Sequence, residues 1–484
     1  MFKRAVLTWG ATLLVLAVTG STALSAPAAA TQTVAQTTIP PTPTPVAVDT
    51  FDPSAAGGRT VVKWYVGLGT GGDPKQIDVQ KRVVDQFNKS QQSTYLTLQI
   101  VDNKIASTTL ATQLAAGNVP DVVGPVGTVG RATFEGNWLD LSEQIAANNF
   151  DMSVYEPSVV SSYNLPGQGQ IGIPFAVFPS FVYFNKDLFD EAGLPYPPQK
   201  FGETYMGKEW NFETVRDLAK VLTVDDRGND ATSPNFQPDH IIQFGFDLQF
   251  GTDPRAMGTL FGANRVINNE GRAVIPPNWQ AAWNFFYDGM FKDHWMPNEA
   301  YRNSDLFGKG SVFNSGNLAM AYTHLWYTCC IDPASKNGKV RNWDIAVVPA
   351  YQGVTTAKLH ADTFGIMKAS KHPNEAFQVY KYLITNRDLL DVYGAMPAIK
   401  SMQSDFFGGM DQKFAPVKVN WQVAVDSLAY NDVPNHEEGL PNFLKARQAL
   451  TDFEKLYNTT PGLDINVESV KLQATLQGIY DERR

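Results

Sequence analysis

Apolar and polar positions alternate between Arg59 and Pro125 in a way that predicts three strands separated by two helices. Strand runs rich in β-branched or aromatic residues are "RTVVKWYVGL", "TYLTLQIV" and "PDVVGP". Between them, apolar residues recur at helical spacing in "KQIDVQKRVVDQFNKS" and in "STTLATQLAAGN", which Gly117 ends. Strands that alternate with helices are typical of a mostly parallel sheet covered by helices, so the sequence predicts an α/β fold.

The pattern changes after Gln170. Two apolar stretches, broken by Pro174 and Pro179, precede a short helix in "IGIPFAVFPSFVYFNKDLFDEAGL". Further helices are predicted in "NFETVRDLAKVLT", which Asn211 caps, in "PPNWQAAWNFFYDGMFKD" and in "HPNEAFQVYKYLIT". Strands are predicted in "NWDIAVVPA" and "DTFGIMKAS". Trp64 and Tyr287 are expected in the core, because nothing in the pattern places them elsewhere.

The N-terminal segment has the order of a secretory signal peptide. Lys3 and Arg4 precede an apolar run, and small residues follow it, so we expect residues 1–30 to be the signal. An uncleaved membrane anchor is the alternative, although the run is short for a span. Residues 31–58 are rich in Thr, Pro and Ala and are predicted to be a disordered tether. The protein is thus expected to be secreted, periplasmic or at the cell surface.

The composition of the chain indicates a large core and disfavours some classes of partner. With 43% hydrophobic and 12% aromatic residues, the chain can build a large core after residue 58. Its formal net charge of −9 argues against nucleic acid or an anionic membrane as the main partner. We expect a monomer.

Local motifs for catalysis, metal or cofactor are weak. "GLGTGG" matches a dinucleotide-binding pattern, but export and the distance to Asp102 disfavour a nicotinamide cofactor. A flexible loop that approaches a ligand, or a plain turn, explains it better. "VDDRGND", Asp225–Asp230, lacks the downstream Glu of a calcium loop and reads as a surface turn.

The six histidines have no H-x-x-x-H spacing, and the chain has no C-x-x-C or G-x-S-x-G motif. We therefore predict no catalytic residue, no metal and no cofactor. Two carboxylates of a glycosidase need not be close in sequence, so that chemistry stays open.

Four segments together resemble the extracellular solute-binding proteins of ABC importers, the maltose-binding-protein-like group. They are "LATQLAAGNVPDVV", "IGIPFAVFPSFVYFNKDLFDEAGLPYPP", "FGKGSVFNSGNLAMAYTHLW" and "WDIAVVPAYQG…HADTFGIMKASKHPNEAFQVYKYLI". The resemblance implies a two-lobed, periplasmic-binding-protein-like fold of type II, with crossover strands as the hinge and a ligand cleft between the lobes. Lobe one would comprise 59–173 and 358–395, and lobe two 174–357 and 396–484.

The resemblance also implies which residues contact the ligand. Trp326 matches the family's stacking Trp, and Phe178 stands at the crossover, where relatives have an acidic contact. The other expected contacts, from the first loop, the third strand, the return strand and the C-terminal part, are Gly69, Asp73, Gly124, Pro125, His360, Asp362 and Trp421. Sugars stack their C–H faces on aromatic rings, so the ligand expected from the aromatic residues is a carbohydrate.

Three functions follow as hypotheses. The first is a non-enzymatic carrier that binds a carbohydrate and delivers it to the membrane subunits of an ABC importer by hinge closure. The second is a secreted, tethered carbohydrate-active enzyme, and the third is a solute-sensing receptor component.

The only two cysteines, Cys329 and Cys330, are adjacent. Export favours oxidation, so a strained disulfide between neighbours is the leading expectation. Buried thiols, or a metal or interchain role, are the alternatives.

Overall fold

The computed structural model describes residues 48–49, 52–165, 167–308, 312–331 and 340–482. The predicted signal peptide and residues 31–47 of the predicted tether lie outside them. Ordered structure begins before Arg59, because the short strand β1 (Val48–Asp49) pairs with β3 and a 3-10 helix covers Pro53–Ala56. Within the described residues, no helix is long and apolar enough to cross a membrane.

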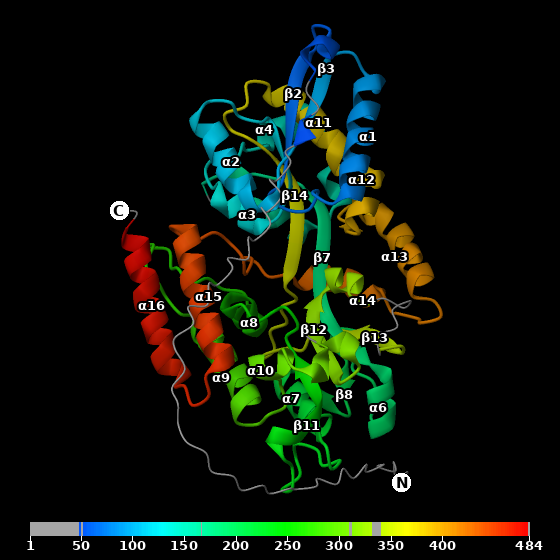
Figure 1. The fold of residues 1–484 in the computed structure, drawn as a ribbon, viewed down its shortest axis with the longest axis vertical. Helices are drawn as coiled ribbons and strands as arrows, with labels where there is room; N and C mark the ends of the chain where they lie inside the picture. The colour runs from blue at the N-terminus through cyan, green and yellow to red at the C-terminus, as the bar shows by residue number, and fades with distance from the viewer. Residues whose placement is uncertain (1–47, 50–51, 166, 309–311, 332–339, 483–484) are drawn as a thin grey trace, which may run out of the picture. The chain divides into compact units, whose positions relative to one another are not determined.

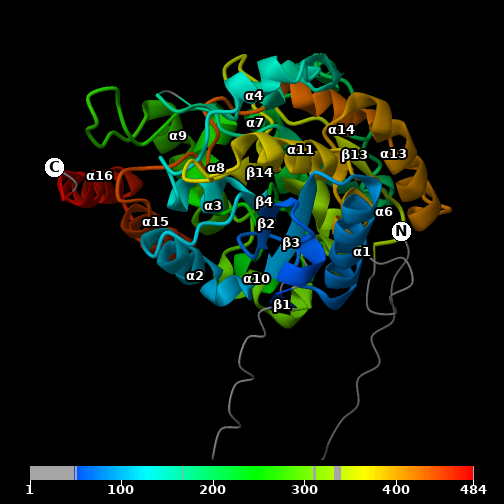
Figure 2. The same cartoon turned by 90° about the horizontal axis from the view of Figure 1, so that it is seen from above.

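The first group of elements, called lobe one, confirms the strand–helix order predicted for the N-terminal third. Strand β2 pairs in parallel with β3 and with β4, and α1 and α2 lie on either side of these strands (Figures 1 and 2). The main elements of lobe one are β2 (Thr60–Val66), α1 (Pro74–Ser90), β3 (Thr94–Ile100), α2 (Asn103–Ala115), β4 (Val122–Val126), α3 (Thr128–Thr133), α4 (Ser142–Ala147), α5 (Pro157–Ser161), α11 (Pro373–Ile384) and α12 (Arg387–Tyr393).

Helix α2 starts earlier than its apolar pattern indicates. Its N-cap is Asp102, whose carboxylate accepts a hydrogen bond from the Lys104 backbone N–H at 2.9 Å. Asp at this position satisfies a donor that the first turn leaves free, so the cap moves the start to Asn103.

Strand β7 (Pro174–Asn185) corrects the expectation of two stretches broken at Pro179. It runs as one strand of 12 residues, and Pro179 stands where its ladder changes partner. Up to Pro179 it pairs with β14 (Leu359–Ile366), and from Ser180 it pairs with β12 (Leu318–His324). A proline lacks the N–H that a central ladder needs, and a change of partner is a place that tolerates it.

The second group, lobe two, continues the same mixed sheet. The sheet has eleven strands and includes β10, β11 and β12, while β13 and β15 pair with β7 off this path. The main elements of lobe two are α6 (Lys186–Ala192), α7 (Phe212–Val221), β10 (Val224–Asp225), β11 (Ile241–Asp247), α8 (Pro254–Gly258), α9 (Pro277–Phe291), α10 (Glu299–Arg302), β13 (Trp343–Ala346), β15 (Met396–Pro397), α13 (Lys400–Phe414), α14 (Gln422–Asp426), α15 (Phe443–Thr459) and α16 (Ile465–Asp481).

The large aromatic residues that the sequence assigns to the core are buried. Trp64 is 0% and Tyr287 is 2% exposed. Asn211 caps α7 as predicted, accepting a hydrogen bond from the Thr214 N–H at 2.9 Å. Helices α15 and α16 pack against each other at the C-terminus (Figure 1).

Candidate functional site

The hinge strands carry three of the predicted ligand contacts on one face. Phe178 on β7 pairs with His360 on β14, and Asp362 follows two residues later. All three are partly exposed, whereas the intervening Ala361 is buried. Because side chains alternate along a strand, Phe178, His360 and Asp362 form a common surface, which we call the hinge floor.

Gly69, Gly124 and Pro125 meet at one edge of lobe one. A Cβ on Gly69 would lie 2.8 Å from the Pro125 carbonyl oxygen, so the loop after β2 touches the end of β4. Gly124 has φ +153°, and a Cβ there would lie 2.7 Å from the Phe364 ring. Only glycine combines that conformation with so close an approach.

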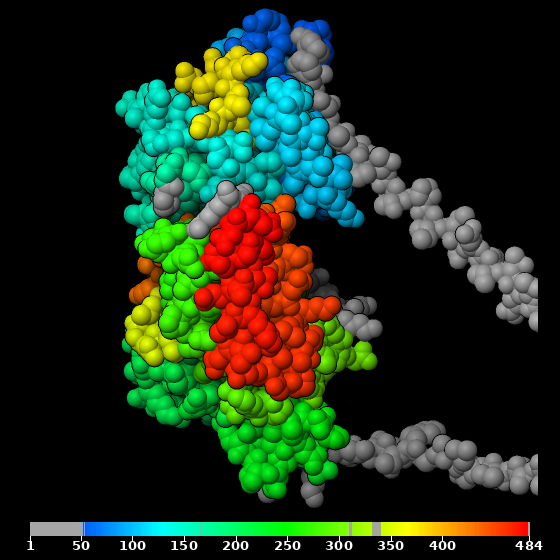
Figure 3. Space-filling view, turned by 90° about the vertical axis from the view of Figure 1, so that its left-hand side faces the viewer, coloured from blue at the N-terminus to red at the C-terminus, as the bar shows by residue number. Residues whose placement is uncertain are grey.

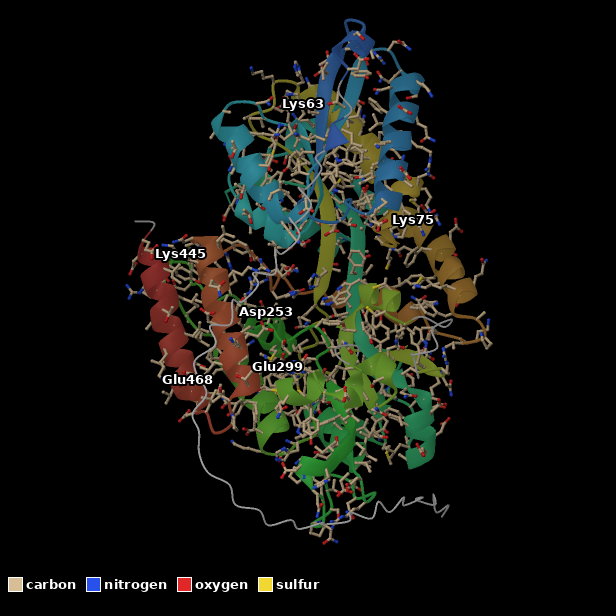
Figure 4. All side chains as sticks on the ribbon, in the orientation of Figure 1. Lys63, Lys75, Asp253, Glu299, Lys445 and Glu468 are labelled. Atoms are coloured by element: carbon tan, nitrogen blue, oxygen red, sulfur yellow. The ribbon has the colours of Figure 1, made fainter. Side chains whose placement is uncertain are left out.

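Asp73 is exposed and caps α1, its carboxylate accepting a hydrogen bond from the Lys75 N–H at 2.9 Å. Figure 4 shows Lys75 at the end of α1 that faces lobe two. The Asp73 side chain is thus part of the helix cap at an edge that faces the other lobe.

Trp326 lies in the 3-10 helix Leu325–Cys329, directly after β12, and is partly exposed. Its ring is 5.6 Å from that of Phe250, which is 58% exposed. Phe250 has φ +55°, a strained conformation for a bulky residue. No local motif marks Phe250, so the sequence pattern did not single it out.

Trp326 connects to the hinge floor through His324. The two rings stack at 6.0 Å, and His324 meets His360 edge-on at 4.0 Å. The aromatic pair of lobe two is therefore linked to the hinge floor by a chain of ring contacts through the buried His324.

The hinge floor has unusual electrostatics. Burial, with the nearby Glu437 carboxylate, raises the pKa of Asp362 to about 6. Burial likewise lowers the pKa of His360 to about 4. Burial alone would raise the pKa of Glu437, but the neighbouring His360 and His436 help hold it below its usual value. A neutral imidazole and a carboxyl of raised pKa can each serve as hydrogen-bond donor or acceptor to a hydroxyl.

The structure does not bring Trp421 to this surface. Trp421 is 6% exposed, stacks on Phe407 at 5.4 Å and packs edge-on against Trp343. Its indole N–H donates to Asp411 at 3.0 Å. This packing places the ring inside lobe two and leaves it no face for a ligand.

Cys329 and Cys330 stand at the end of the 3-10 helix that holds Trp326. Their sulfur atoms are 3.4 Å apart as thiols, and Cys329 is exposed. The hydrogen bond with Cys330, opposed by burial and helped by Lys413, lowers the pKa of Cys329 to about 6. A thiolate beside a second thiol is readily oxidised. The disulfide between Cys329 and Cys330 therefore stays a prediction for the exported protein.

The acidic turn at Asp225–Asp230 is organised from within. The buried Asp225 carboxylate accepts hydrogen bonds from the backbone N–H groups of Arg227, Asn229 and Gln237, at 2.9, 2.9 and 3.1 Å. These bonds stabilise the turn through the oxygens of Asp225, and the absence of calcium stays a prediction.

A cavity of about 390 Å³ adjoins the hinge between α3 and the segment 433–439. It is lined by Thr128, Arg131, Ala132, Glu135, Trp138, Ser161, Ser162, Asn164, Leu165, Gln168, Ile171, Arg265, Val433, Pro434, Asn435, Glu438 and Gly439. None of the nine predicted ligand contacts lines it. Figure 3 shows the face of the molecule on which the cyan part of lobe one lies above the red and green parts of lobe two.

Arg131 is the charged residue of this cavity that stands out. It is 7% exposed, and its Nε is buried without a hydrogen-bond partner. The guanidinium stacks on Tyr163 at 4.4 Å and donates to the Thr128 hydroxyl at 2.9 Å. A buried donor without a partner is costly, so a ligand oxygen at this position would be stabilising.

Residues 75–388 match the sequence model of the family described as bacterial extracellular solute-binding protein. That match covers more than half of the chain. The protein belongs to this family.

Among curated relatives, the chain is 28% identical over 159 residues to the sn-glycerol-3-phosphate-binding periplasmic protein UgpB of Rhizobium meliloti (strain 1021). The match covers 31% of this chain and 36% of UgpB, so it spans about a third of that relative.

Solved structures share the two-lobed fold. UspC of M. tuberculosis is 19% identical with a TM-score of 0.67, covering 87% of this chain and all (100%) of UspC. The sugar-binding protein MalE from Xanthomonas citri is 16% identical with a TM-score of 0.64, covering 88% of this chain and 98% of MalE. The predicted fold class is therefore confirmed, and the protein is one of a family of extracellular binding proteins.

Proposed function

We propose that the protein binds a carbohydrate between its lobes and delivers it to the membrane subunits of an ABC importer. The observation that carries the proposal is the exposed Phe250 and the partly exposed Trp326 beside it, which ring contacts through the buried His324 link to the hinge floor. Aromatic rings beside convergent polar groups suit the two kinds of surface that a sugar presents.

The polar groups are suited to hydroxyls. Asp362 and His360 stand on the hinge floor, and the adjoining cavity offers the unpartnered Arg131 Nε. A cavity of about 390 Å³ falls in the range of small-molecule sites. MalE of Xanthomonas citri is named a sugar-binding protein and UgpB an sn-glycerol-3-phosphate-binding protein. Both named solutes carry hydroxyl groups, which supports a hydroxyl-bearing ligand here.

Closure of the two lobes on the ligand is the change that the membrane subunits of the importer would recognise. Strands β7 and β14 pair with each other where the two lobes join, so bending them moves one lobe against the other. A ligand that contacts both lobes favours the closed form only by its higher affinity for it. The proposal includes the lobe boundaries, with lobe one at 59–173 plus 358–395 and lobe two at 174–357 plus 396–484. It also includes export by the signal peptide, residues 1–30, and a monomeric state.

The test is titration calorimetry of the exported protein against mono- and oligosaccharides and glycerol phosphates. We expect one carbohydrate class to bind with a stoichiometry of one. Binding of glycerol phosphates alone, with no sugar bound, would contradict the carbohydrate assignment.

The same experiment separates a carrier from a carbohydrate-active enzyme. The bound glycan is recovered after prolonged incubation and analysed by mass spectrometry. A carrier returns it intact, and newly formed fragments would identify an enzyme instead.

A further inference from the structure

Three histidines that lie far apart in the sequence meet at the hinge. His324 ends β12, His360 lies on β14, and His436 precedes α15. Their ring centroids are 4.0 Å (His324–His360), 5.2 Å (His360–His436) and 6.2 Å (His324–His436) apart. One nitrogen from each lies within 4.8 Å of the other two, and no other such group of His, Cys, Asp and Glu occurs among the described residues.

A buried carboxylate orients His436. Its Nδ1 lies 2.6 Å from Asp432 Oδ2, and both side chains are at most 2% exposed. Asp432 is itself fixed, because it accepts hydrogen bonds from the backbone N–H groups of Leu359 and His436. A carboxylate on one ring nitrogen is the arrangement that metal-ligating histidines use, because it directs the other nitrogen, here Nε2, to the metal.

His324 offers an unsatisfied nitrogen. The residue is 2% exposed, and its Nε2 is buried without a hydrogen-bond partner. A buried imidazole nitrogen without a hydrogen-bond partner is available for a bond to a metal. The His360 side chain is 33% exposed, which leaves the cluster open on one side.

The charged side chains around the three histidines favour the binding of a cation. Asp432 is one acid at the cluster, and Glu437 is another, its Oε2 3.6 Å from His360 Nδ1. The Lys358 ammonium is buried over the Tyr322 ring. Asp253 and Arg255 nearby form an ion pair that is neutral as a whole. These five groups together carry a formal charge of −1.

We propose that His324, His360 and His436 bind a divalent transition-metal ion of the zinc class. Three imidazoles suit Zn²⁺, Co²⁺ and Ni²⁺, and the fourth position is left for water or Glu437. Bonds of about 2.0–2.1 Å in a tetrahedron require nitrogens roughly 3.4 Å apart, so the rings draw together on binding. Because Trp326 stacks on His324, the ion would stand beside the proposed carbohydrate surface, but its binding does not depend on a sugar.

The test is metal binding to the full exported protein, purified without a polyhistidine tag and stripped with a chelator. Calorimetry with Zn²⁺ is expected to show one ion per chain. His324→Gln and His360→Gln are expected to weaken binding at least about tenfold, and Asp432→Asn about 10–100-fold. His372→Gln alters an exposed histidine outside the cluster and is the matched control, with unchanged affinity.

Two further experiments test whether the histidines, and not the cysteines, bind the ion. Replacing both Cys329 and Cys330 by Ser is expected to leave binding intact, and loss of binding would assign the ion to the thiols instead. If a buried variant fails to fold, the Co²⁺ absorption of the wild-type protein decides. Nitrogen ligation without a sulfur-to-cobalt charge-transfer band supports the site. No bound ion in the wild-type protein, or equal binding by the cluster variants, overturns the proposal.

Discussion

Trp326 is the single side chain on which the proposed binding surface most depends. We expect Trp326→Ala to lower carbohydrate affinity about tenfold, or about 1.4 kcal/mol, because a ring face that excludes water is lost. Folding should be little changed, since the ring is partly exposed. Calorimetry measures the affinity. Tyr196→Ala, which removes a 42% exposed aromatic residue of lobe two, is the control, and an equal loss in both variants would remove Trp326 from the site.

The Asp225 carboxylate is expected to stabilise the folded protein in a way that depends on pH. Burial alone would raise its pKa, but hydrogen bonds from Asn229, Arg227 and Gln237 lower it to about 2. A folded-state pKa below the unfolded value of 3.8 stabilises the protein above that pH. The wild-type advantage over Asp225→Asn should therefore be constant above about pH 4 and vanish as the pH falls to about 2.

Urea unfolding of wild type and Asp225→Asn across this pH range measures that difference. A difference that persists undiminished at the acid end would show that the carboxylate charge is not the cause. Asp230→Asn, which alters a partly exposed carboxylate that accepts hydrogen bonds from Thr232, is the control.

At the residue scale, the sequence could place only residues that a motif marks. The resemblance located Trp326, Phe178 and His360 because strings like those of the family surround them. In the structure, Phe178 pairs with His360, and the buried His324 contacts both His360 and Trp326. Phe250 and His436 reach the same region through loops, where long-range contacts rather than local periodicity decide position. Trp421 shows the converse, since an aromatic residue without a placing motif is packed inside lobe two.

At the scale of elements, close packing between a strand and a helix sets a strong constraint. A Cβ on Gly245 of β11 would lie 2.0 Å from the Ala219 backbone oxygen of α7. We expect Gly245→Ala to destabilise the protein by about 1–3 kcal/mol, because backbone must move to make room. Thermal unfolding measures the change.

Gly478→Ala is the matched control. Gly478 is exposed in α16, with nothing within 4 Å of an added Cβ. Alanine there should stabilise the helix by about 0.5–1 kcal/mol. Equal effects of the two substitutions would contradict the packing of α7 on β11.

Elements with a clear period were predicted well, and their ends less so. The period of α1 and the N-cap of α7 are local signals, and the structure has both. The continuity of β7 through Pro179 is not local, because it depends on β14 and β12 supplying the two halves of its ladder. The sequence therefore predicted a break in the strand at Pro179, whereas in the fold β7 continues and only its pairing partner changes there.

At the scale of the whole molecule, the sheet joins the lobes through β7 and β14, with Phe178, His360 and Asp362 on its hinge. This arrangement explains how a bound solute can be reported to a partner at a distance, since bending two strands moves whole lobes. The family assignment was foreseeable from four strings in order, whereas the histidine cluster was not. Its members stand on separate elements that only the fold brings together.

Small-angle X-ray scattering with and without the bound carbohydrate tests the central claim most directly. The proposal places the ligand between two lobes that close on it, so the radius of gyration should fall on saturation. Trp326→Ala at the same ligand concentration should show a smaller fall, in proportion to its lower occupancy. A protein that binds the carbohydrate at full occupancy with an unchanged radius of gyration would contradict the account.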